Sequence, residues 1–400
     1  MENYGKIDAA TGMHSRLLDF EKALNFCIDF ALEQSVDFFL FSGDAYKTAH
    51  PSPTQQKLLM RCLLRLYKAG IPVIIVVGNH DNPLSFGKAN SLEIFGDLPF
   101  DGFHVIDTPR CVKLETKNGP IQIVGIPWPT RNSLNINTKH LSSSAQEITE
   151  YIAAAVTAIV QDFAQKLDPT IPSVLAGHLT VSSGIFSGSE KRAIYGNDPV
   201  LLPSQLAIEP FDYVALGHLH RYQDLNKNGY PALVYAGSIE RIDFGERKEP
   251  KGFCYVKVER KKTTHQFIEG PMRPFIQIEV HLTENVENHT QELLDEIKKY
   301  TLDGAIVKIL YHVPAGLANG VDNAQIQRAC FNAQYIVGIF PLFKSSVREK
   351  RSGLSLTQDL STLLNHYFEE KPLLRDRKEL LTKRAVELFN EAQSCCGDDE

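Results

Sequence analysis

Four apolar runs in this sequence end in the same way, with a glycine and then a side chain that can bind a metal ion. The side chains offer a carboxylate, an amide oxygen and imidazole nitrogens, without a thiolate. Such a mixed nitrogen and oxygen set suits manganese, iron or zinc rather than calcium or a structural zinc finger. The four endings are Ser42-Gly43-Asp44, Gly78-Asn79-His80-Asp81, Gly177-His178 and Gly217-His218-Leu219-His220.

The chemistry that fits these residues is displacement at phosphorus. Two divalent ions close together activate a water and clamp the attacking and leaving oxygens, and the carboxylate of Asp44 is able to bridge such a pair. His80 directly follows Asn79 and is placed to protonate the leaving oxygen or to stabilise the transition state. His218 and His220 are two residues apart, so on a continuing strand they would face the same side. They would then hold one metal each or share one site.

Each of these motifs also has an ordinary structural interpretation. A Gly-Asp pair after a strand is commonly a turn, and a single buried histidine commonly packs in a core. Asp81 or Asn82 could cap the following helix. Four such endings in one chain favour the metal site, because the carboxyl ends of parallel strands gather at one edge of an open α/β sheet.

The elements that must position these residues are short apolar strands separated by helices. The strands are mostly apolar throughout, as in a sheet that helices cover on both faces. Residues 54–69 carry leucines at helical spacing with Gly70 placed to end the helix, and residues 147–167 show a second helical pattern. A strand, a helix and another strand indicate an α/β fold. The expected strands are Val36–Phe41, Val73–Val77, Ile121–Ile126, Val174–Ala176, Tyr213–Leu216 and Leu233–Ala236.

The pattern changes near Gly270-Pro271-Met272-Arg273-Pro274, which predicts a domain entry. The following segments alternate as strand, helix, strand, helix, strand, over residues 275–282, 290–300, 305–313, 324–333 and 336–340. After a charged bend at residues 348–351 we expect two amphipathic helices, the second with Leu374, Leu381, Ala385 and Leu388 on one stripe. The predicted domains are therefore residues 1–270, 271–345 and 346–400.

Composition narrows the class of protein. The chain has 400 residues, too many for one ordinary domain, and a formal net charge of -6, which excludes binding to nucleic acid through bulk positive charge. No apolar run reaches the length of a membrane helix, and the N-terminus lacks the pattern of a signal peptide. Seven cysteines without a C-x-x-C pair indicate reduced thiols, so we expect a cytoplasmic protein without a membrane partner.

In the order of its motifs the sequence resembles the calcineurin-like metallophosphoesterases, and within them the nuclease subunits of the SbcCD DNA-repair complex. The resemblance is strongest between Val36 and Gly252. It is carried by the four endings above and by three longer stretches. These are Phe41–Lys47 followed by Pro51–Gln56, Tyr213–Arg221, and Tyr235–Arg241.

This resemblance implies a fold, a site and partners. The fold would be an α+β sandwich with a smaller α/β capping domain and C-terminal helices. Asp44 would bridge two divalent ions, manganese in first place, with Asn79, His178 and His218 on one ion and His220 on the other, and His80 would be the catalytic histidine. The capping domain would help to select DNA ends, and the C-terminal helices would dock on an SbcC-type ATPase, in a homodimer within a heterotetramer.

The sequence departs from the family pattern in two places. Lys47 stands near a position where many relatives carry a histidine. Whether His50 takes the place of that histidine stays open. Relatives also open with a strand ending in Asp-x-His, and the sequence given begins after that motif. We therefore expect the polypeptide as written to be a weakened or inactive nuclease, with a start codon assigned too late and the missing strand encoded upstream of Met1.

Three functions remain open at this point. The first is a metal-dependent DNA nuclease, acting as an exonuclease on double-strand ends and as an endonuclease on hairpins or single strands, in DNA repair and recombination. The second is a related phosphoesterase acting on nucleotides or phosphoproteins. The third is a catalytically impaired DNA-end-binding or scaffold subunit, which the missing Asp-x-His motif suggests.

Overall fold

The computed structural model describes residues 4–83, 88–98, 101–130, 133–134, 144–188, 198–284, 288–314, 319–343, 364, 368 and 378–395. The chain divides into two compact units. One comprises residues 1–311 and 320–340, and the other comprises residues 312–319 and 341–400. The three domain boundaries expected from the sequence stay a prediction.

Two sheets form the centre of the first unit. A three-stranded parallel sheet contains β1 (Phe39–Phe41), β2 (Val73–Val76) and β3 (Phe103–Ile106) in that order. A six-stranded sheet has the order β10-β11-β9-β6-β5-β4. Its four central strands are parallel, and β4 and β10 are antiparallel edges. These strands are β4 (Arg110–Thr116), β5 (Gly119–Ile126), β6 (Ser173–His178), β9 (Tyr213–Gly217), β10 (Gln223–Asp224) and β11 (Ala232–Tyr235).

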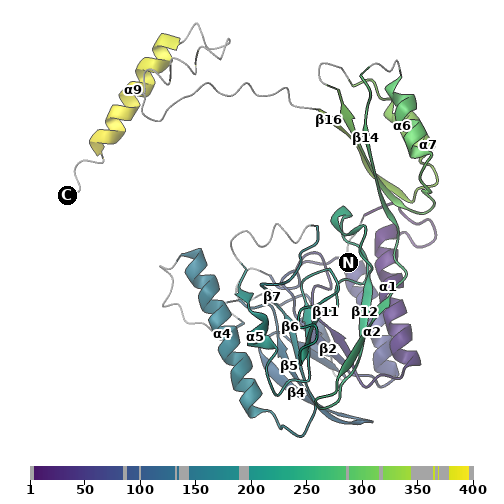
Figure 1. The fold of residues 1–400 in the computed structure, drawn as a ribbon, viewed down its shortest axis with the longest axis vertical. Coiled ribbons are helices and arrows are strands. Elements are labelled where there is room, and N and C mark those ends of the chain that lie inside the picture. Colours follow the sequence, from purple (N-terminus) through teal and green to yellow (C-terminus); the bar gives the residue numbers. More distant parts are fainter. Residues whose placement is uncertain are drawn as a thin grey trace. The chain divides into compact units, whose positions relative to one another are not determined.

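The two sheets pack face to face, and helices cover their outer faces (Figure 1). Ile74 and Val76 of β2 point into the layer between the sheets, where they join Val174 of β6. The alternate residues of β2 face α1 (Ser15–Glu33) and α2 (Pro53–Lys68). On the other side α4 (Ala145–Lys166) and α5 (Pro203–Leu206) cover the six-stranded sheet. The expected α/β sandwich is therefore confirmed.

The helix signals in the sequence are matched by local hydrogen bonds. Ser52 and Gln55 form a reciprocal capping box at the start of α2, with Pro53 at the first helical position. Gly70, just past the end of the helix, has a φ of 71°, in the left-handed region that glycine adopts readily. Ser144 and Glu147 make the same capping box at the start of α4.

One edge of the small sheet borders a cavity. β1 is an edge strand, and a cavity of about 650 Å³ lies between it, the six-stranded sheet and β12. Its lining is mixed, with apolar residues such as Phe38, Leu40 and Phe253 beside charged residues such as Lys257 and Glu259. The remaining short elements of this part of the chain are α3 (Glu93–Gly96), β7 (Thr180–Val181), β8 (Val200–Leu201), η3 (Phe244–Glu246), β12 (Gly252–Lys257) and β13 (Thr264–Glu269).

The alternating segments after residue 271 form a separate three-stranded sheet of order β14-β15-β16. The elements are β14 (Phe275–His281), α6 (His289–Ile297), β15 (Ile306–Val313), α7 (Asn323–Ala329) and β16 (Tyr335–Phe343), which confirms the expected order of strands and helices. α9 (Lys378–Cys395) corresponds to the second expected C-terminal helix, whereas Leu374 and most of the first lie outside the described residues. Among the helices in these ranges, none is long and apolar enough to cross a bilayer.

Candidate metal centre

The candidate ligands lie where the two sheets meet at the carboxyl ends of their parallel strands. Asp44 follows β1 and Asn79 follows β2 in the small sheet, whereas His178 ends β6 and His218 follows β9 in the large sheet. β6 and β9 are hydrogen-bonded neighbours, so His178 and His218 come from adjacent strand ends. The geometry thus follows from the parallel order of the strands.

Four side chains approach one another closely. The Nε2 atom of His178 lies 3.1 Å from Oδ2 of Asp44 and 3.0 Å from Oδ1 of Asn79. The Nδ1 atom of His218 lies 3.2 Å from the same oxygen of Asn79. Asp44, His178 and His218 form a group that can hold a metal ion. We call these three residues and Asn79 the four-residue cluster; their individual roles as ligands stay a prediction.

His178 presents a lone pair to two oxygens. Its Nδ1 atom lies 2.7 Å from the carbonyl oxygen of Ser42, which can only accept, so Nδ1 carries the ring proton. In the neutral ring Nε2 is then an acceptor that faces the carboxylate of Asp44. Because two acceptors repel at 3.1 Å, they need a shared cation, either a proton or a metal ion. His178 is fully buried, so water does not screen this repulsion.

The charges of the cluster shift the pKa values of its members in opposite directions. Burial acts to raise the pKa of Asp44, but the neighbouring His178 outweighs it, and the pKa lies below the usual range. Burial acts to lower the pKa of His178, and the Asp44 carboxylate overcomes this and raises it. Burial lowers the pKa of His218, which favours the neutral ring that a metal requires.

Asp81 forms hydrogen bonds to both loops that carry Asp44 and Asn79. Its fully buried carboxylate accepts from the backbone N–H of Asp44 (2.7 Å) and of Gly78 (3.1 Å). Burial, and then the charge of Asp44, raise the pKa of Asp81. The sequence suggested Asp81 as a helix cap, and the structure instead shows it joining the loop after β1 to the loop after β2.

Gly78 allows these two loops to touch. A Cβ atom at this position would overlap the Oδ1 atom of Asp44 and lie 2.5 Å from its backbone nitrogen. Asp44 itself has a φ of 57°, and His218 has a φ of 97°, both in the left-handed region that is uncommon for residues other than glycine. Strained backbone of this kind concentrates at functional sites.

The chain turns at His218 instead of continuing as a strand. β9 ends at Gly217, so the strand does not continue through His218 and His220, which was the condition for expecting them to face the same side. His218 turns toward Asn79, and the ring of Trp128 packs against it with centroids 4.9 Å apart. The other ring nitrogen, Nε2, lies 3.6 Å from Oδ2 of Asp198, and both atoms are buried without a hydrogen bond among the described residues.

His220 contacts a different partner. Its Nδ1 atom lies 2.7 Å from Oε1 of Glu246, which is fully buried. His220 is not a member of the group Asp44, His178 and His218, whose ligand atoms lie close enough together to hold one metal ion. The assignment of His220 to a second ion therefore stays a prediction.

His80 lies at the rim with its side chain exposed. Its backbone N–H donates to Oδ1 of Asp44 over 2.9 Å. Its Nδ1 atom lies 2.8 Å from the carbonyl oxygen of Lys47, so Nδ1 carries a proton and Nε2 is the ring atom with exchangeable acid–base function. Lys47 stands near the position where many relatives carry a histidine, and in this chain its backbone carbonyl orients the ring of His80.

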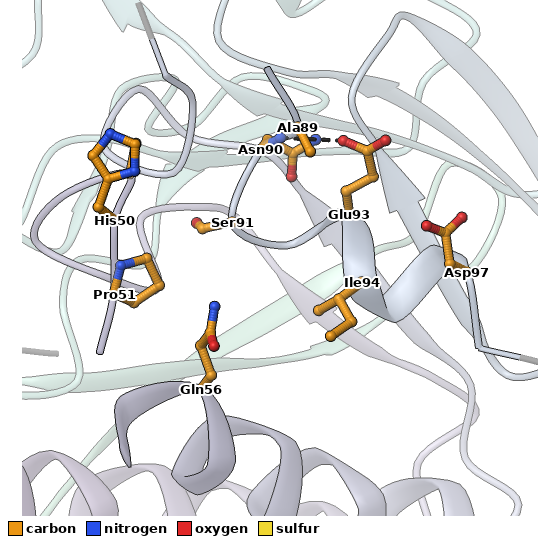
Figure 2. Close-up of a pocket in the computed structure, with 10 residues that line it drawn as sticks. His50, Pro51, Gln56, Ala89, Asn90, Ser91, Glu93, Ile94 and Asp97 are labelled. Carbon is orange, nitrogen blue, oxygen red and sulfur yellow. Dashed lines mark hydrogen bonds between the residues drawn. The ribbon is translucent and has the colours of Figure 1, made fainter. Parts of the chain in front are cut away.

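A pocket of about 460 Å³ is lined by residues that follow β1, such as His50 and Pro51, and by residues that follow β2, such as Asn90 and Ser91 (Figure 2). Ser91 in its wall is bonded to the loop after β2, through its N–H and the carbonyl of Asp81 over 3.0 Å. His50 lines this pocket and is not a member of the four-residue cluster. The described lining residues include Glu93 and Asp97 and no lysine or arginine, so the pocket is poorly suited to bind phosphate.

The sequence did not indicate Trp128, Asp198 or Glu246 as parts of the site. Trp128 lies just after the carboxyl end of β5, as the candidate ligands lie at or just after the ends of their strands. This position in the sequence could have indicated Trp128 as a site residue. Asp198 and Glu246 follow no strand of the central sheets. Only the folded loops bring them to His218 and His220.

The donor atoms of the cluster fit a divalent cation. Ligands in neighbouring positions of an octahedral ion bound at about 2.1 Å are about 3 Å apart. The distances from Nε2 of His178 to Asp44 and Asn79, and from Asn79 to His218, are 3.1, 3.0 and 3.2 Å. Two nitrogens and two oxygens match the preference of Mn²⁺, Fe²⁺ or Zn²⁺.

Comparison of the chain with known proteins identifies its family. The family model described as calcineurin-like phosphoesterase matches residues 6–222, more than half of the chain. The SbcD subunit of the nuclease SbcCD from Staphylococcus saprophyticus subsp. saprophyticus is 30% identical over 265 residues, which cover 66% of this chain and 65% of that protein. The corresponding SbcD subunit from Staphylococcus epidermidis is 24% identical, with the same shares covered. The chain thus matches just under two thirds of the length of these relatives.

Proposed function

The chain belongs to the calcineurin-like phosphoesterase family, and from this premise we propose that it is a metal-dependent DNA nuclease subunit of the SbcCD type. The similarity to the SbcD subunits of two SbcCD nucleases supports a phosphodiester in DNA as the substrate. The separate β14-β15-β16 sheet and the helix α9 support it too, because an enzyme for small phosphoesters needs neither.

One observation carries the proposal. The Nε2 atom of His178 lies 3.1 Å from the Asp44 carboxylate and 3.0 Å from the Asn79 amide oxygen inside a buried site, so these atoms need to share a proton or a metal ion. A divalent cation relieves the repulsion among these three acceptors. When bound, it supplies an activated water and charge stabilisation at the phosphoryl oxygens. Asp44, Asn79, His178 and His218 would hold it, and His220 would serve a second ion.

The residues of the chain itself then position and protonate the substrate. His80 is exposed at the rim, and its Nδ1–H bond to the Lys47 carbonyl fixes the plane of the ring. A proton on Nε2 of His80 would pass to the leaving oxygen of the DNA strand as the phosphorus–oxygen bond breaks. The Trp128 ring packs against His218, and in this position it would limit the access of bulk water to the ligands.

The finer assignments extend the proposal. The protein would act as an exonuclease on double-strand ends and an endonuclease on hairpins or single strands, with Mn²⁺ as its metal. It would assemble with an SbcC-type ATPase through the C-terminal helices, as a homodimer within a heterotetramer. Exposed leucines on α9, Leu380 and Leu388, support a partner at this helix. A cytoplasmic location agrees with this assignment.

The decisive experiment compares substrates with the purified chain in Mn²⁺, with and without the cognate SbcC-type ATPase. We expect cleavage of end-labelled duplex and hairpin DNA and of bis(p-nitrophenyl) phosphate, with loss of activity on chelation. Faster hydrolysis of p-nitrophenyl phosphate or nucleotides than of DNA would favour the second function, a small-molecule or phosphoprotein phosphoesterase. DNA-end binding without hydrolysis in the presence of Mn²⁺ and the ATPase would favour a scaffold subunit.

A further inference from the structure

Behind His220 lies a buried charge pair that the proposed reaction does not use. The carboxylate of Glu246 accepts from Nδ1 of His220 (2.7 Å) through one oxygen. Its other oxygen accepts from the backbone N–H of Ile242 (3.0 Å) and forms an ion pair with the ammonium of Lys251 (2.9 Å). Glu246 and Lys251 are both fully buried. A charge pair costs desolvation at such a depth, so it calls for an explanation.

Lys251 is bonded to both ends of this arrangement. In addition to Glu246, its ammonium donates to the backbone carbonyl of His220 over 2.8 Å. One lysine therefore holds the main chain of His220 and the carboxylate that contacts the ring of His220. A third contact, to Glu249 at 3.3 Å, completes the three donors of the ammonium. With these contacts, neither the ring nor the carboxylate can turn without breaking a buried bond.

The hydrogen bond to Glu246 selects one tautomer of His220. A carboxylate accepts, so Nδ1 carries the proton, and in the neutral ring the lone pair is on Nε2. His178 shows the same arrangement, with Nδ1 on the carbonyl of Ser42 and Nε2 directed at the cluster. A metal-binding histidine commonly donates its second ring nitrogen to a carboxylate or carbonyl, which fixes the ring and raises its basicity.

We propose that Glu246, held by Lys251, is the positioning residue that fixes His220 with its proton on Nδ1 and its lone pair on Nε2, ready to bind a divalent cation. The cation-binding part rests on the proposed function, whereas the tautomer is a property of the metal-free protein. Glu246 itself touches neither substrate nor metal. It acts through the ring of His220.

The test separates the hydrogen bond from the charge. Removal of Glu246 alone would leave the buried Lys251 with only the longer contact to Glu249, so both variants also carry Lys251→Met. The variant E246L/K251M lacks the acceptor, and E246Q/K251M restores an amide acceptor of the same shape. Glu249→Gln is the matched control, because Glu249 bonds to Lys251 and to Ser187 but not to the His220 ring.

Two measurements are made on each protein. The first is the ¹⁵N NMR tautomer of His220 in metal-free protein at pH 8, with the signal assigned by its loss in His220→Gln. We expect the Nδ1–H form in wild type, E246Q/K251M and the control, and a shift to the Nε2–H form in E246L/K251M. The second is Mn²⁺ affinity by titration with electron paramagnetic resonance. We expect the weaker Mn²⁺ site of E246L/K251M to bind about 10–100-fold less tightly than that of E246Q/K251M.

The outcomes distinguish this inference from the proposed function. An Nε2–H tautomer in wild type, or the same tautomer in both double variants, would overturn the positioning role. Equal affinity of both double variants for two Mn²⁺ ions would overturn it as well and leave the nuclease proposal standing. Failure of wild type to bind any Mn²⁺ would reject the proposed function, and the tautomer measurement would then decide the role of Glu246 alone.

Discussion

The Oδ2 atom of Asp44 lies 3.1 Å from the Nε2 atom of His178, although the strands that carry these residues to the site belong to different sheets. Asp44 follows a strand of the three-stranded sheet, and His178 ends a strand of the six-stranded sheet. The candidate metal centre is therefore also a junction between the two halves of the sandwich. A cation shared by these residues would join the sheets, so metal binding should also stabilise the fold.

The first prediction concerns this junction. His178→Ala should weaken Mn²⁺ binding by more than about 100-fold, because a lost ligand costs more than the 10–100-fold typical of a residue behind a ligand. Phosphodiester hydrolysis should fall with it. Mn²⁺ titration and hydrolysis of bis(p-nitrophenyl) phosphate measure the two effects. His289→Ala serves as the control, since His289 is half-buried, lies outside the four-residue cluster and bonds only the carbonyl of Thr283 among the contacts described for it. Equal Mn²⁺ affinity in both variants would refute the ligand role of His178.

The second prediction separates catalysis from metal binding. His80→Ala should lower kcat by about 10²–10⁴-fold, because a positioned proton donor contributes that much. Mn²⁺ and DNA affinity should remain, since the contact of His80 with Asp44 is made by the backbone N–H, which alanine keeps. Single-turnover cleavage and Mn²⁺ titration test the two halves. Loss of metal in parallel with activity would make His80 a ligand and overturn the assignment.

The third prediction uses the close approach of two loops. In Gly78→Ala the new methyl group would overlap the Asp44 carboxylate and lie 2.5 Å from its backbone nitrogen, so the loops must separate. We expect loss of Mn²⁺ binding and a lower free energy of unfolding. Gly96→Ala is the control, because a methyl group there meets only Val105 at an ordinary 3.6 Å. Normal Mn²⁺ affinity in Gly78→Ala would show that the loops need not touch.

The fourth prediction concerns stability and its pH dependence. The buried carboxylate of Asp212 accepts from Ser173 N–H, the Tyr230 hydroxyl and Arg260. Burial acts to raise the pKa of Asp212, but these hydrogen bonds outweigh it and the pKa is lowered. The stabilisation is therefore complete above the unfolded-state pKa near 4 and is lost as the pH falls through the lower folded-state pKa.

Asp212→Asn should accordingly cost about 3 kcal/mol at pH 7, as for a broken buried pair. The difference from wild type should shrink in urea unfolding below about pH 4. Asp162→Asn removes an exposed pair with Lys166 and should cost less than about 1 kcal/mol. A difference for Asp212→Asn that does not change with pH would show that the charge of this residue is not what stabilises the fold.

Much of the fold was predictable because central strands such as β2 and β6 are buried on both faces. Val73–Val76, for example, is apolar at every position and buried at every position. α1 was not assigned from the sequence, although Leu24, Ile28 and Ala31 have helical spacing and face the core. Its start carries no signal, because the side chain of His14 makes no capping hydrogen bond.

The candidate site was predictable only as far as strand order determines it. Asp44, Asn79, His178 and His218 could be brought together from strand ends alone, since parallel strands place those ends on one edge. The direction of His220 could not be predicted, because it depends on the left-handed backbone of His218. Glu246 reaches His220 from the end of the short helix η3, and a contact of this kind has no periodicity in the sequence.

The last prediction concerns the C-terminal helix. In α9, Leu381, Ala385 and Leu388 lie at helical spacing on one stripe, and the side chain of Leu388 is half exposed. A helix that lays such a stripe into an apolar groove is a common way to bind a coiled coil. Deletion of the residues after Pro372, or the double change Leu381→Ser and Leu388→Ser, should abolish co-purification with the cognate SbcC-type ATPase. Hydrolysis of bis(p-nitrophenyl) phosphate should persist, since the helix belongs to the other compact unit.

The matched control for this prediction is Lys383→Ser, because Lys383 is two residues from Leu381 and so lies near the opposite face of the helix. Undiminished co-purification of the double variant would assign the stripe to internal packing, and equal loss in the control would point to charge rather than apolar contact.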